Sequence, residues 1–111
     1  MTARGRSEFK RWLAQPVTRH DVIRNANMLM LRFAFMDQFG KKGAAVRFLR
    51  ALHGELLAYI PGLREYLRSN QEYMPDSGRL ALESGIQSYE AQLRWSKSAL
   101  AIYQDNKGEK R

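Results

Sequence analysis

The chain has 111 residues, a length that fits one domain and leaves no room for a second. Charged residues make up 27% and hydrophobic residues 44%, which excludes an unfolded polar chain. Cysteine is absent, which excludes a disulfide framework and a thiolate metal site. The formal net charge is +8, and residues 1–50 hold all of the excess, with eleven Lys or Arg against three acids. Such a basic half attracts phosphate groups but does not define a fold.

Apolar residues recur three and four positions apart, which predicts an all-α protein of three to four helices. The first helix is expected over residues 3–14, with Thr2 as its N-cap and Pro16 beyond its end. The second is expected over residues 21–39. It is apolar on nearly every side, so its burial should require a partner chain as well as the other helices.

The third helix is expected over residues 42–69, with a kink or a fresh start at Pro61, because proline cannot donate a backbone hydrogen bond. The fourth, also long, is expected over residues 78–104. It carries two neighbouring apolar seams, which predicts contact with two helices at once. We therefore expect the helices to pack across a two-fold dimer, with residues 105–111 as a flexible tail.

Residues suited to catalysis or metal binding are sparse. His20 and His53 have no ligand partner at helical spacing, and Glu83 and Glu90 are too far apart on one helix face for paired acid–base work. No phosphate-binding glycine motif is present. We expect no enzyme activity, no metal and no cofactor.

Targeting features are also missing. The N-terminal residues carry positive charge without the apolar core of a signal peptide. The longest apolar run, residues 28–36, is too short to span a bilayer, which takes roughly 20 residues. A soluble, cytoplasmic protein without membrane contact is the expectation.

Two segments resemble PadR-family transcriptional regulators. The opening TARGRSEFKRWLAQPV is similar to the segment that follows the wing of that family, through Thr2, Gly5-Arg6 and Trp12-Leu13. The closing ALESGIQSYEAQLRWSKSAL resembles the family's last helix. The matching positions there are Leu82-Glu83, Gly85-Ile86, Tyr89-Glu90, Leu93 and Trp95. Between these segments, RNANMLMLRFAF lies where the family has a charged residue and an apolar run.

The resemblance implies that residues 1–104 form the C-terminal helical domain of such a regulator, which pairs two protomers and tunes DNA binding. The winged helix that reads DNA in the family is missing from this chain. We therefore expect a homodimer that contacts DNA only weakly or indirectly. A heterodimer with full-length relatives is a further expected partnership.

Three groups of residues follow as candidates. The dimer interface and core are assigned to Leu29, Phe33, Met36, Leu82, Ile86, Tyr89, Leu93, Trp95 and Leu100. Contact with a small-molecule effector is assigned to Trp12 and Trp95, and contact with phosphate to Arg4, Arg6, Lys10 and Arg11. The alternative function is a small basic helical protein that binds nucleic acid non-specifically through residues 1–50.

Overall fold

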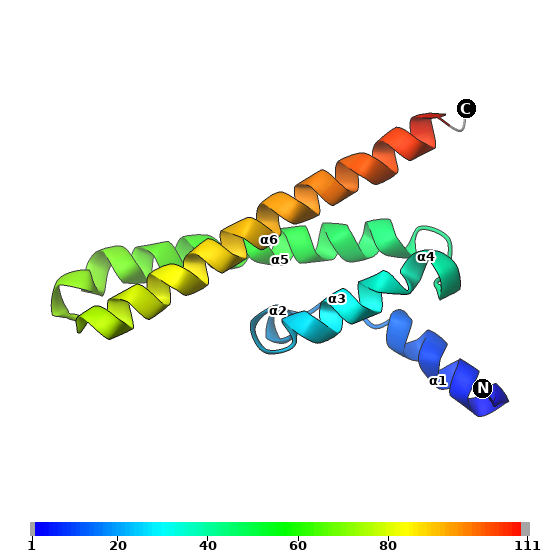
Figure 1. Ribbon diagram of the computed structural model, residues 1–111, viewed down its shortest axis with the longest axis horizontal. Helices are drawn as coiled ribbons and strands as arrows, with labels where there is room; N and C mark the ends of the chain where they lie inside the picture. The colour runs from blue at the N-terminus through cyan, green and yellow to red at the C-terminus, as the bar shows by residue number, and fades with distance from the viewer. Residues whose placement is uncertain (1, 110–111) are drawn as a thin grey trace. The chain divides into compact units, whose positions relative to one another are not determined.

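The regular elements in the described part of the chain are all helical. The computed structural model describes residues 2–109, and within them six α-helices and one short 3-10 helix follow one another (Figure 1). The all-α class is confirmed, but the count of three to four helices was too low. The chain divides into two compact units, the first ending at Leu52 and the second starting at His53. The boundary lies inside helix α5 (Ala44–Asn70), which contributes to both units.

Helix α1 (Ala3–Leu13) has the predicted N-cap. Thr2 has extended backbone geometry, and its hydroxyl accepts a hydrogen bond from the Gly5 amide at 3.0 Å. This bond satisfies one of the amides that the first helical turn leaves without a partner. The helix ends at Leu13, before Pro16, with Lys10 and Arg11 in its last turn, where positive charge suits the helix dipole.

The single second helix expected over residues 21–39 is wrong. Three helices occupy that region: α2 (Arg19–Arg24), α3 (Ala26–Ala34) and α4 (Met36–Phe39). The first break falls at Asn25, whose φ of −128° and ψ of 33° lie outside the helical region. Asparagine side chains compete with the backbone for hydrogen bonds, which favours such breaks. The second falls at Phe35, whose amide donates to the Arg32 carbonyl at 3.2 Å in a tighter turn.

Ring contacts join α1 to the rest of the first unit. The Phe9 ring centroid lies 5.8 Å from that of Phe35 and 5.4 Å from that of Phe39, both in edge-on geometry. Aromatic pairs at such distances add to the stability from burial. The buried apolar core of this unit comprises Leu13, Val22, Leu29, Met36, Ala45, Phe48, Leu49 and Leu52.

Helix α5 continues through Pro61 without a fresh start, and the alternative expectation of a kink there stays a prediction. Pro61 removes one backbone hydrogen bond, the one that the Leu57 carbonyl would accept. Pro61 and Leu57 are both exposed. Water can therefore hydrogen-bond the carbonyl, and the helix continues to Asn70.

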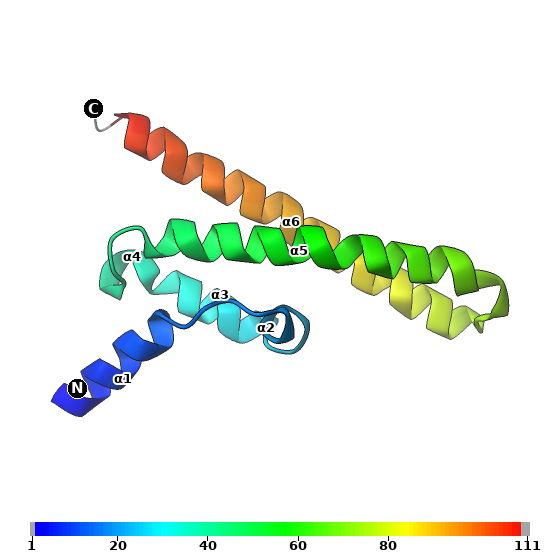
Figure 2. The same ribbon diagram turned by 180° about the vertical axis from the view of Figure 1, so that it is seen from behind.

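The second unit is a helical hairpin. The later part of α5 leads through the 3-10 helix η1 (Gln71–Tyr73) into α6 (Asp76–Glu109), and Figures 1 and 2 show the two helices side by side near this turn. The Tyr59 and Tyr89 rings meet edge-on at 5.3 Å between centroids, and Arg64 forms an ion pair with Glu90. The final helix is long, as expected, and it packs against the later part of α5.

Helix α6 extends five residues past Gln104, the expected end, because no proline interrupts it. Its regular structure reaches Glu109, and residues 110–111 of the expected tail lie outside the described residues. The assignment of residues 105–111 to a flexible tail stays a prediction.

Candidate functional site

The outward face of α3 is apolar. Met28, Met30 and Leu31 are 49%, 37% and 47% exposed, while the opposite side of the helix buries Leu29 and Arg32. Large apolar side chains gathered on one short helix mark a contact surface more often than a surface that meets only water. We refer to Met28, Met30 and Leu31 as the α3 face.

A second uncharged surface runs along α6. Its positions alternate three and four residues apart, the spacing of a seam between paired helices. Most side chains in it are small, which lets a second helix approach closely. All are exposed: Ala81, Ser84, Ser88, Ala91, Trp95, Ser98 and Ile102. We refer to these residues as the α6 stripe.

The residues predicted as interface and core fall into three classes of exposure. Leu29, Met36 and Ile86 are fully buried within the chain itself, so the pairing of two chains could bury nothing more there. Trp95 is 38% exposed. The remaining five are half-buried: Phe33, Leu82, Tyr89, Leu93 and Leu100.

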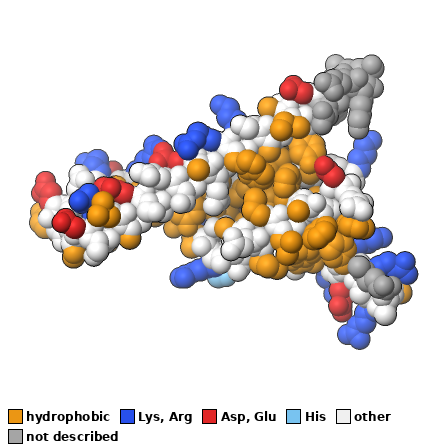
Figure 3. Space-filling model, viewed as in Figure 1, with side chains coloured by type: hydrophobic (Ala, Val, Ile, Leu, Met, Phe, Trp, Pro, Cys, Tyr) orange, Lys and Arg blue, Asp and Glu red, His pale blue; other side chains and the backbone are white. Residues whose placement is uncertain are grey.

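The basic residues of α1 face solvent. Arg4, Arg6, Lys10 and Arg11 are all exposed, and Figure 3 shows blue side chains of this helix beside apolar side chains that gather over α3 and α4. Arg4 places its Nε 3.3 Å from a carboxylate oxygen of Glu8. An exposed pair of this kind is weak, so it leaves Arg4 able to turn to a phosphate.

Arg32 is a buried cation in the middle of the first unit. Arg32 is 3% exposed. Within the described part of the chain, its Nε and Nη2 atoms have no hydrogen-bond partner. Its Nη1 donates to the Trp12 carbonyl at 3.5 Å, and its guanidinium carbon lies 5.7 Å from the Phe48 ring centroid. Burial lowers the pKa of Arg32, and the charge of Asp21 opposes this shift.

Asp21 caps helix α2. The Asp21 amide donates to the Thr18 hydroxyl at 3.1 Å, and the Thr18 amide donates to the Asp21 carboxylate at 3.2 Å, which completes a capping box. Burial alone would raise the pKa of Asp21. Hydrogen bonds from Thr18 and Asn25 and the charge of Arg32 outweigh it, so the pKa is lowered.

This lowered pKa makes Asp21→Asn a pH-dependent change. Asp21 contributes stability above its unfolded-state pKa of about 3.9 and loses the contribution as pH falls through the lower folded-state pKa. Asp21→Asn is expected to lower the free energy of unfolding by about 1 kcal/mol at neutral pH and by less at about pH 2. Urea unfolding followed by circular dichroism at both pH values measures this. The control is Glu72→Gln at an exposed acid, and an equal loss for Asp21→Asn at both pH values would contradict the assignment.

His53 has a structural contact in the second unit. The Ser96 hydroxyl, fully buried, donates to the Leu93 carbonyl at 2.8 Å. Its oxygen therefore accepts from Nδ1 of His53, 3.2 Å away, which places the proton of the neutral ring on Nδ1. His20 is exposed. Among the side chains that the structure describes, no three His, Cys, Asp or Glu residues are grouped to hold a metal ion.

A cavity of about 510 Å³ lies in the first unit. Residues from the end of α1, the 15–17 linker, α4 and the first turns of α5 line it, and neither Trp12 nor Trp95 does. The effector contact assigned to those two tryptophans stays a prediction. Sequence reasoning missed this cavity, although the motif Gly40-Lys41-Lys42-Gly43 was an available signal for a shaped basic loop.

Comparisons with known proteins add no family. No protein-family model, curated protein or solved structure matches the chain. Across the described residues, no helix has both the length and the hydropathy that crossing a membrane requires.

Proposed function

We propose that this protein is a self-association module whose two copies pair through uncharged helical faces. The observation that carries the proposal is the α3 face, where Met28, Met30 and Leu31 remain substantially exposed. Pairing about a two-fold axis places the same patch of each copy against the other and removes both from water. The α6 stripe is a second surface that such pairing can use.

The energetics favour a dimer of modest affinity. Covering the exposed part of one large apolar side chain contributes about 1 kcal/mol, so six such side chains from two α3 faces contribute about 6 kcal/mol. Association costs about 4–15 kcal/mol in lost freedom of motion. The α3 face alone is therefore marginal, and burial of a second surface such as the α6 stripe must add to it.

Light scattering on a sizing column tests self-association. Between micromolar and millimolar concentrations the mass should rise toward twice the chain mass of 12.9 kDa. The rise should be insensitive to salt, because apolar contacts carry no charge for salt to screen. A mass that stays at that of one chain over the whole range would refute the proposal.

The resemblance to PadR-family regulators suggests where such a module acts. In that reading residues 1–104 form the dimerisation domain of a PadR-like transcriptional regulator, which brings two DNA-reading domains together. Full-length relatives would be further pairing partners. Co-expression of this chain with a tagged full-length PadR protein, followed by affinity purification, tests the heterodimer, and recovery of the tagged protein alone would count against it.

Non-specific nucleic-acid binding is the second candidate, favoured by the exposed α1 cations Arg4, Arg6, Lys10 and Arg11. If these residues contact phosphates, each contact should release counterions, and affinity should fall steeply as salt rises. Fluorescence anisotropy with a labelled DNA duplex should show that Arg6→Gln with Lys10→Gln reduces the salt slope by about two. Arg68→Gln with Arg94→Gln, which also removes two exposed positive charges but outside residues 1–50, is the charge-matched control. Binding that is absent at low salt would exclude this function.

A further inference from the structure

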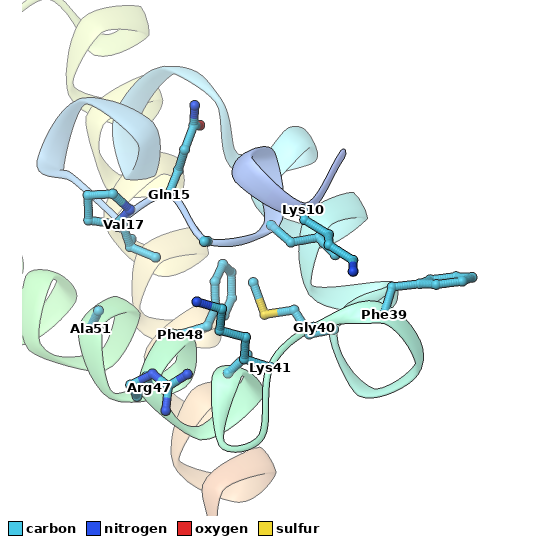
Figure 4. Close-up of a pocket in the computed structure, with 14 residues that line it drawn as sticks. Lys10, Gln15, Val17, Phe39, Gly40, Lys41, Arg47, Phe48 and Ala51 are labelled. Carbon is cyan, nitrogen blue, oxygen red and sulfur yellow. The ribbon is translucent and has the colours of Figure 1, made fainter. Parts of the chain in front are cut away.

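The cavity of the first unit has an apolar floor. Leu13, Met36 and Phe48 line it, and all three are buried residues of the core. Figure 4 shows the Phe48 ring turned toward the cavity, whereas the Phe39 ring points away from it. A volume of about 510 Å³ lies within the range of about 300–1,000 Å³ that is typical of small-molecule sites.

Positively charged side chains line the cavity together with this apolar floor. Lys10, Lys41 and Arg47 are exposed residues of the lining, and no Asp or Glu is among the fourteen residues that line the cavity. Among the described residues none of the three cations forms an ion pair. The cavity therefore combines an apolar floor with a positively charged rim that attracts anions.

The rim is shaped by its backbone. Gly43 has a φ of 79°, a conformation that glycine adopts at little cost. A Cβ on Gly40 would lie 2.7 Å from the Met36 carbonyl oxygen, so only glycine fits there without a shift. Arg47 donates from Nη1 to the Lys42 carbonyl at 3.1 Å, which holds its guanidinium beside the loop. These contacts shape the loop that carries Lys41 and hold Arg47 beside it before any ligand arrives.

We propose that the cavity binds a small amphiphilic anion, a carboxylate with an unbranched apolar chain of medium length. The carboxylate lies among Lys10, Lys41 and Arg47, and the chain lies on Leu13, Met36 and Phe48. A bare phosphate would use the rim and leave the floor empty, whereas an uncharged hydrocarbon would leave the three cations without a partner. An anion with an apolar chain uses both features. This site is independent of the proposed self-association.

Isothermal titration calorimetry with decanoate, below its micelle concentration, tests the proposal. One decanoate should bind per chain, and affinity should rise about four-fold for each methylene added from hexanoate to decanoate, as each methylene leaves water. Decanol, with the same chain and no charge, should bind at least about five-fold more weakly than decanoate. Acetate, with the charge and no chain, should show no measurable binding.

Charge-matched variants locate the site. Lys41→Gln and Arg47→Gln should each weaken decanoate binding about five-fold. Lys42→Gln and Arg50→Gln remove the same charge from neighbouring positions outside the lining, and they should leave the affinity unchanged. Circular dichroism spectra and melting curves of all four variants verify that the fold is intact.

Three results would overturn the proposal. The first is equal affinity for decanoate and decanol, which would show that the rim cations do not contribute. The second is equal weakening by the lining and control variants, which would show binding to the basic surface in general. The third is co-sedimentation with phosphatidylglycerol vesicles that depends on Lys41 and Arg47 while free decanoate fails to bind, which would assign the site to a membrane headgroup.

Discussion

Leu31→Glu is expected to convert the self-associated protein into a monomer and to raise the dissociation constant at least about a hundred-fold. Leu31 is 47% exposed on the α3 face, which the proposed two-fold pairing would bring against the same face of the second copy. The change removes apolar area and places two carboxylates in a region that pairing would dry. Either effect alone opposes association. Light scattering over the same concentration range as for the unmodified chain measures the result.

Leu57→Glu is the matched control for this variant. Leu57 is also an exposed leucine in the middle of a helix, at 53% exposure, but it lies on α5 and outside the α3 face. A new carboxylate there adds the same charge to the chain without changing the α3 face, so it should leave association unchanged. Equal loss of association in both variants would show that overall charge, rather than the α3 face, controls the dimer.

Local signals predicted the ends of the fold well. Thr2 was identified as a cap because a hydroxyl before a helical run can accept an amide hydrogen bond, and the structure contains that bond. The buried face of the last helix could be predicted because Ile86 and Ser96 belong to a series of residues at helical spacing. Both residues are buried in the structure. Sequence patterns of this kind depend only on neighbours within a few turns.

The middle of the chain was misread where two local preferences compete. The apolar period across residues 21–39 favoured one helix, but Asn25 and Phe35 interrupt it. A break of one residue hardly disturbs the apolar period, so the pattern could not reveal it. At Pro61 the sequence left a kink or a fresh start open, and the structure excludes the fresh start. The choice depends on whether water reaches the Leu57 carbonyl, which only the fold determines.

Some surface features could also be predicted from the sequence, and others could not. The second helical region was expected to need a partner chain for its burial, and the α3 face remains exposed in the single chain. The basic loop from Gly40 to Gly43 could be recognised in the sequence, but the cavity could not, because residues of this loop, the 15–17 linker and α5 line it together only in the fold. The sequence shows Arg32 as the one charge in the run MLMLRFAFM. The apolar period of that run could not show whether the Arg32 side chain faces water or the core.

Arg32→Met is expected to raise the free energy of unfolding by about 1–3 kcal/mol. The side chain is buried, two of its donor atoms find no acceptor in the described protein, and burial already lowers its pKa. A buried donor without a partner costs about 1–3 kcal/mol, and the buried charge adds to that cost. Methionine is similarly long and apolar, and its flexible thioether can pack against the Phe48 ring that the guanidinium now faces.

Urea unfolding of Arg32→Met, Asp21→Asn and the double variant measures both the gain and its coupling to Asp21. Part of the cost of Asp21→Asn is the loss of a favourable charge near Arg32, so this cost should shrink when Arg32 is already methionine. Arg32→Lys keeps a charge but loses the planar contact with Phe48, and it should destabilise the protein. Destabilisation by Arg32→Met would contradict the prediction. It would mean that a bound anion or water supplies the acceptors that the protein lacks, and that Arg32 is itself part of a binding site.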